Sequence, residues 1–188
     1  MDTWDERAVR TRLRAKLAAD PGHARSGAGT HRYALAGPRP EAEVRGFEAR
    51  HGIRLPAAYR SFVTAVGDGP AGPAHGLLPL TRPRAEAADP DGDGGWAVDG
   101  EWADDRRPGR LAAPFAPAGP LPGVPRGPVE ELTGGSLTLA EEGCGMFLRL
   151  VLNGPYAGQV WRLDPDWGGF VPARPDFRTW YTDWLEEP

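Results

Sequence analysis

The chain has 188 residues with 22 basic and 26 acidic side chains, which gives a net charge of −4 at pH 7. This length fits one compact domain, and an apolar content of 40% lies well above that of a disordered chain. Glycine and proline contribute 26 and 21 residues, which predicts many turns between short elements and excludes long helical bundles and coiled coils.

The cysteine content and the hydropathy of the chain indicate the cellular compartment in which the protein is expected. Cys144 is the only cysteine, so a scaffold of intramolecular disulfides is excluded. The first twenty residues interrupt their apolar side chains with Asp5, Glu6 and Arg7, and no segment is typical of a signal peptide or a membrane span. We therefore expect a cytoplasmic protein with no membrane partner.

The charge is divided unevenly along the chain. Residues 1–60 carry 12 basic and 7 acidic side chains, whereas residues 61–188 carry 10 basic and 19 acidic ones. The segment from Ala85 to Asp105 contains acidic residues and no basic residue, which predicts either a negative binding surface or a solvated acidic loop. The arginines near the N-terminus are expected to form a solvated helix face and no nucleic-acid site.

Residues 1–40 are expected to form a helix and a flexible connection. Thr3 and Glu6 form a capping-box pattern, which predicts that a helix begins there, and Pro21 is expected to end it. Residues 21–40 are rich in Gly, Ala and Arg and lack apolar periodicity, which indicates a loose connection.

Two further helices are predicted before residue 68. One covers residues 41–51 and ends at Gly52, and the other follows Pro56 and ends before Gly67. The second has apolar side chains at helical spacing. These are Tyr59, Phe62, Val63 and Val66.

The remaining chain predicts an antiparallel sheet and a closing helix. Residues 77–80 are expected to form a short strand that Pro79 confines to an edge or to the end of a ladder, and residues 81–128 a long insertion rich in Pro, Gly and Asp. Three strands in a meander and a last helix from Pro175 or Asp176 follow, so residues 41–188 are expected to form one α+β domain. The strands are residues 136–140, 146–152 and 159–163.

Motifs for cofactors and metals are weak. Residues 67–72 match GxGxxG, but they follow a helix and precede Pro73, so they predict a turn and no dinucleotide site. Residues 89–94 resemble the start of a calcium-binding loop, yet Gly100 stands where the bidentate Glu belongs. We expect no cofactor and no metal site, with a weak surface cation site at 89–94 left open.

Catalytic patterns are also weak. No serine lies in a GxSxG motif, and the four histidines are scattered along the chain. Cys144 is expected to fit a tight turn, and Glu141 and Glu142 would act as an acid/base pair only if they point into one pocket. We expect a protein that is not an enzyme, and keep a hydrolase using Glu141, Glu142 or Cys144 as an alternative.

Taken together, the order of short motifs resembles the SUKH superfamily, which includes fungal cell-wall regulators and many bacterial immunity proteins. The resemblance covers Glu41 to Leu80 and Ser136 to Glu187. The matching residues are Phe47-Glu48, Leu55-Pro56, Tyr59, Phe62, Gly67, Gly69, Leu77-Leu78-Pro79-Leu80, Gly143-Cys144-Gly145, Leu150-Val151-Leu152, Gly154, Gly158, Val160-Trp161, Phe177, Trp180, Tyr181 and Leu185.

This resemblance implies helices packed against a mainly antiparallel sheet and a binding role without catalysis. Members typically neutralise a toxin domain encoded next to them by forming a tight complex, and many such toxins are nucleases with basic grooves. The alternative within the same fold is a regulatory or scaffolding adaptor linked to the cell envelope.

The acidic segment is the expected toxin-binding surface, because negative charge attracts a basic groove and excludes nucleic acid from it. Its two tryptophans are expected either to anchor the partner or to fasten the segment to its own domain. The candidate residues are Glu86, Asp89, Asp91, Asp93, Trp96, Glu101, Trp102, Asp104 and Asp105.

Overall fold

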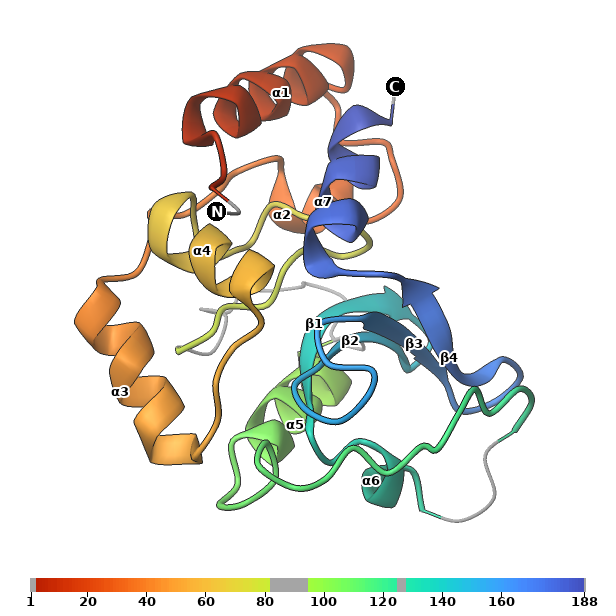
Figure 1. Cartoon of the computed structure of the whole chain (residues 1–188). Coiled ribbons are helices and arrows are strands. Elements are labelled where there is room, and N and C mark those ends of the chain that lie inside the picture. Colours follow the sequence, from red (N-terminus) through yellow and green to blue (C-terminus); the bar gives the residue numbers. More distant parts are fainter. Residues whose placement is uncertain (1–2, 82–94, 125–127, 188) are drawn as a thin grey trace.

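The structure is a computed structural model that describes residues 3–81, 95–124 and 128–187, and Figure 1 shows the arrangement of its elements. Helices precede, flank and follow a four-stranded sheet, which confirms the α+β fold. The elements are α1 (Glu6–Ala19), α2 (Ala28–His31), α3 (Glu41–His51), α4 (Ala57–Ala65), α5 (Gly95–Asp105), α6 (Val129–Leu132), β1 (Ser136–Gly143), β2 (Met146–Val151), β3 (Val160–Asp164), β4 (Gly169–Arg174) and α7 (Phe177–Glu186).

The sheet has the order β1-β2-β3-β4, and every neighbouring pair is antiparallel. The three predicted strands are confirmed, and β4 is an additional strand that the sequence pattern did not indicate. Phe170 of β4 exchanges two backbone hydrogen bonds with Leu121 on the outer side of the strand. Pro172 lies two residues further on, so its backbone nitrogen faces the same outer edge and removes no hydrogen bond to β3.

Both faces of the sheet are covered, as the side chains of β2 show, because they point alternately to one face and to the other. Leu148 and Leu150 belong to the main core, under the helices, whereas Val151 contacts Trp161 and Phe170 in a second cluster on the opposite face. In Figure 1, α7 stands over one side of the sheet and α5 and α6 lie on the other. The sheet is therefore the middle layer of three.

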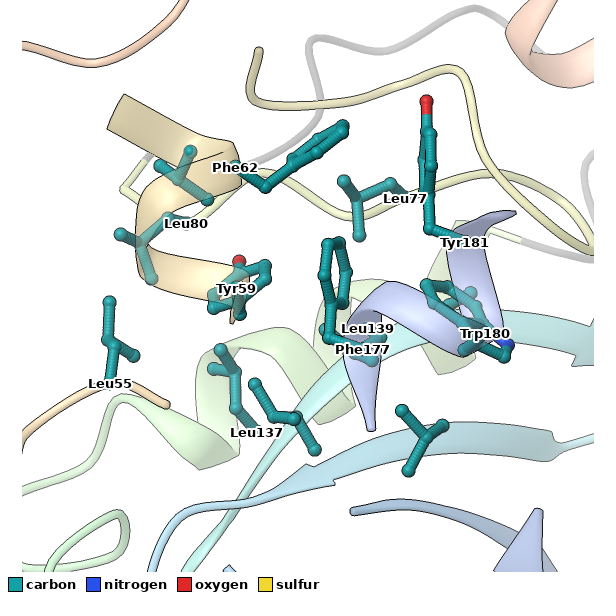
Figure 2. Close-up of a cluster of buried hydrophobic side chains, with 14 of the residues drawn as sticks. Leu55, Tyr59, Phe62, Leu77, Leu80, Leu137, Leu139, Phe177, Trp180 and Tyr181 are labelled. Carbon is teal, nitrogen blue, oxygen red and sulfur yellow. The ribbon is translucent and has the colours of Figure 1, made fainter. Parts of the chain in front are cut away.

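Aromatic rings join α4 and α7 in the main core. Phe62 and Tyr59 of α4 lie 5.3 and 4.9 Å from the ring of Phe177, and Phe62 lies 4.5 Å from Tyr181. Figure 2 shows these side chains pointing toward one another, with Leu137 and Leu139 of β1 beside them. Burial of rings on both helices holds the helical layer on the sheet.

The predicted start of the first helix is wrong by a few residues. Asp5, and not Thr3, is the N-cap, because the Asp5 carboxylate accepts a hydrogen bond from the backbone N–H of Ala8 at 2.9 Å. Trp4 then turns inward, and its indole N–H donates to the carbonyl of Ala58 at 2.9 Å. This contact ties the N-terminal segment to α4.

Residues 21–40 pack more closely than their composition suggests. They contain α2, and Tyr33 is buried with its hydroxyl donating to Asp20 at 2.8 Å. Burial, together with the hydrogen bond to Asp20, raises the pKa of Tyr33 to about 12. Val9 and Leu13 of α1 share the main core with later elements, so α1 lies on the same core as the rest of the domain.

The predicted strand at 77–80 is not a strand. Leu78 nevertheless donates its backbone N–H to the carbonyl of Leu139, and His75 donates to that of Glu141, along the outer edge of β1. The 75–78 loop and Leu121 thus cover parts of the two sheet edges that would otherwise expose unpaired backbone groups.

Candidate functional site

The structure places the predicted binding residues in two groups. Glu86, Asp89, Asp91 and Asp93 lie outside the described residues, and so does the cation site considered at 89–94. Trp96 lies in α5, but its side chain also falls outside the described part. The last four candidates follow on the same helix, where their contacts are described. These are Glu101, Trp102, Asp104 and Asp105.

Arg149 in the middle of β2 is the centre of a buried polar network. Its side chain is 0% exposed and forms ion pairs with Glu101, at 2.8 Å, and with Asp105. It also donates to the hydroxyls of Ser136 and Thr138 at 2.9 and 2.7 Å. The network joins α5 to β1 and β2 through charge-assisted hydrogen bonds.

Asp105 is a correction to the predicted surface. Its side chain is 1% exposed and accepts the backbone N–H of Thr138 at 2.7 Å, in addition to pairing with Arg149. A carboxylate that satisfies a buried arginine and a strand N–H cannot also face a partner. Asp105 is a structural residue, because its two contacts stabilise the packing of α5 on the sheet.

Glu101 and Asp104 retain partial exposure but are also paired. The Glu101 side chain is 28% exposed, and burial raises its pKa while the charge of Arg149 opposes that rise. The carboxylate of Asp104 contacts Arg107 and Arg110, each at 2.8 Å. The described end of the acidic segment is therefore largely neutralised by arginines of the same chain.

Trp102 is fastened to its own domain. Its indole N–H donates to the carbonyl of Pro79 at 2.8 Å, and the guanidinium of Arg106 lies 3.6 Å from the centre of its ring. Arg106 also donates to the carbonyls of Pro79 and Leu80, and burial lowers the pKa of Arg106 to about 10. These contacts match the second of the two roles expected for the tryptophans.

His51 at the end of α3 lies beside this arginine. Its ring centre is 4.5 Å from that of Phe47, and burial lowers its pKa below 6.5, with repulsion from Arg106 and Arg50 acting in the same direction. The folded state therefore favours neutral His51. The stability that depends on the neutral ring is fully present above the unfolded-state pKa, near 6.5, and is lost as the pH falls through the lower folded-state value.

We predict that His51 titrates below 6.5 in an NMR pH titration of the folded protein. The Arg50→Gln variant should move the midpoint back toward the ordinary value, since Arg50 is exposed and its loss removes repulsion without opening the core. A midpoint at or above 6.5 in the wild type would contradict this assignment.

The two glutamates of the hydrolase alternative contact different partners. Glu141 is mostly buried with a carboxylate oxygen 3.7 Å from Nδ1 of His75, whereas Glu142 pairs with Arg162. Cys144 is exposed in the β1–β2 turn at φ +53°. Among residues 3–81, 95–124 and 128–187, no group of three or more His, Cys, Asp or Glu side chains is placed to hold a metal ion.

The GxGxxG match at 67–72 has a packing explanation. A Cβ atom on Gly67 would lie 2.4 Å from the carbonyl oxygen of Ala36, and one on Gly72 would lie 2.9 Å from the backbone nitrogen of Leu77. These glycines allow close backbone approach as the chain leaves α4, in agreement with the turn expected from the sequence.

An exposed apolar surface lies at the β3–β4 turn, and the sequence pattern did not single it out. Trp167 is 84% exposed, Val124 is 63% exposed and Leu121 is 36% exposed. Leu121 pairs with Phe170, and the carbonyls of Leu121 and Gly123 lie against Gly169, so this segment adjoins the turn. We call it the Trp167 surface, which consists of Leu121, Val124, Asp166 and Trp167.

No family model, curated protein or solved structure matches this chain. Within the part of the chain that is described, no helix combines the length and the apolar character needed to cross a bilayer.

Proposed function

We propose that this protein is a cytoplasmic immunity protein of the SUKH superfamily that neutralises a cognate toxin domain by forming a tight complex. It acts in this proposal without catalysis and without a cofactor. The toxin is a polymorphic toxin of bacteria, with a nuclease as the activity that an acidic inhibitor fits best.

The observation that carries the proposal is the position of the residues that resemble the superfamily. Tyr59 and Phe62 of α4, Leu150 of β2, and Phe177 and Tyr181 of α7 lie together in the main core. They come from segments far apart in the sequence and occur in the order of the resemblance. Since these residues maintain a shape, recognition is assigned to exposed side chains around the core.

The described carboxylates support a binding role, because they are paired with arginines of the same chain. Glu101 and Asp105 are engaged with Arg149, and Glu142 is engaged with Arg162. Each carboxylate stabilises the position of a strand or a helix. Residues 86–93 of the acidic segment stay a predicted part of the toxin-binding surface.

The test is to purify the protein and the toxin domain encoded by the adjacent gene, the latter as a catalytically inactive variant. A stable complex at micromolar concentration and loss of toxin activity at equimolar ratio are expected. An adjacent gene without a toxin domain, or no complex at micromolar concentration, would contradict the proposal and favour an adaptor with a host partner.

A further inference from the structure

Large exposed apolar side chains concentrate at one place in the described chain. Leu17 on α1, Leu121, Val124 and Trp167 are the large hydrophobic residues with high exposure, and all except Leu17 lie on the Trp167 surface. Single exposed hydrophobic residues are ordinary, but a cluster that includes a nearly fully exposed tryptophan is typical of a binding surface.

The turn that carries Trp167 is held by its own hydrogen bonds. The carboxylate of Asp164 accepts from the backbone N–H groups of Asp166 and Trp167 at 3.2 and 3.0 Å. The two glycines after Trp167 permit close packing, because a Cβ on Gly169 would lie 1.9 Å from the carbonyl oxygen of Leu121. The backbone under Trp167 is thus fixed by an Asx turn on one side and by the 121–123 segment on the other.

A preorganised backbone beneath an aromatic side chain favours binding because little backbone entropy is lost on association. Tryptophan is also the residue type most enriched among side chains that dominate interface energies, where it fills an apolar pocket on the partner. The Trp167 surface therefore has the composition of an interface anchor and a backbone held in place by hydrogen bonds.

The charges around the turn define the partner's chemistry. Asp166 is exposed, whereas the Asp164 carboxylate is buried 3.8 Å from Arg162, which also pairs with Glu142. Among these four described side chains the carboxylates outnumber the arginine, and Asp166 is the exposed one. Charge complementarity then favours a partner pocket that is apolar in its centre and rimmed by Arg or Lys.

We propose that the Trp167 surface contacts the toxin, with the Trp167 indole inserted into an apolar pocket whose rim is basic. This inference rests on the proposed function and identifies the face of the protein that performs it. Asp166 steers the encounter by long-range attraction, and Trp167 with Leu121 and Val124 holds the complex once it has formed.

The test compares binding of three variants to the inactive toxin domain from the adjacent gene. Trp167→Ala removes the anchor, Asp166→Lys reverses the charge beside it, and Leu17→Ala is the matched control because Leu17 is also exposed, at 40%, but lies on α1. We expect Trp167→Ala to weaken binding by about 30-fold or more and Asp166→Lys to slow association most at low salt, while Leu17→Ala leaves both unchanged. Thermal unfolding should show that all three variants remain folded.

The outcomes separate the two proposals. If the wild type forms no complex, the proposed function fails before any variant is compared. If the wild type binds and Trp167→Ala binds equally well, the immunity role stands and the Trp167 surface is not the interface. If the wild type is a dimer that Trp167→Ala converts to a monomer without loss of toxin binding, the surface joins two copies and the inference is wrong.

Discussion

The Arg149→Met variant is expected to lose about 3–5 kcal/mol of unfolding free energy, because it leaves Asp105 buried without its cation. The Asp105 side chain is 1% exposed, so water cannot replace the lost partner unless α5 moves away from the sheet. The methionine side chain fills much of the volume of the arginine stem, which separates the loss of charge from the opening of a cavity. Urea unfolding followed by circular dichroism measures the difference.

The matched control is the double variant Arg149→Met with Asp105→Asn. An asparagine at position 105 carries no charge, and its side-chain oxygen can still accept the backbone N–H of Thr138. We therefore expect the double variant to be more stable than Arg149→Met alone by more than about 1 kcal/mol, because it removes the buried unpaired charge. If Arg149→Met alone costs less than about 1 kcal/mol, the ion pair is not buried in solution.

This network explains why the prediction of an acidic surface is wrong for Asp105. The density of negative charge can be read from the segment's own sequence. Whether a carboxylate is paired depends on residues that are distant in the sequence. Arg149 follows Asp105 by 44 positions, and Thr138 follows it by 33. No periodicity within residues 95–105 indicates that one carboxylate faces the sheet, so α5 could not be oriented from its own residues.

The helices with clear apolar periodicity were predictable for the opposite reason. In α4 and α7, buried side chains repeat at helical spacing, and the information needed to identify each helix lies within ten residues. The β1–β3 meander was equally readable from strand-length apolar runs separated by Gly-containing turns. β4 was missed because Pro172 is typical of a loop unless the strand is known to lie at an edge.

Trp167 shows what the sequence could have indicated about the candidate site. It lies between Asp166 and two glycines, in a run of turn-forming residues between two strands. An aromatic residue in such a turn lacks the neighbours that would bury it, which is a local signal for exposure. Its place beside Leu121 and Val124 could not be read, because it depends on a backbone pairing between residues 121 and 170.

Trp161, only six positions earlier, is expected to behave in the opposite way to Trp167. Trp161 is 0% exposed and packs among Phe115, Tyr156 and Phe170, with ring-centre distances of 5.0, 5.1 and 5.3 Å. The Trp161→Ala variant should lose about 3–5 kcal/mol of unfolding free energy, because it leaves a cavity among rings that are held by separate segments.

Trp167→Ala is the control for that measurement, and it should change the unfolding free energy by no more than about 0.5 kcal/mol because an exposed side chain loses little packing. If Trp161→Ala is too unstable to measure, Trp161→Phe keeps a ring at the site and should show a smaller loss in the same direction. Equal losses for Trp161→Ala and Trp167→Ala would mean that Trp167 is packed in solution. In that case Trp161 in the core and Trp167 in the turn would both be packed. The turn would then not present an exposed tryptophan to the toxin.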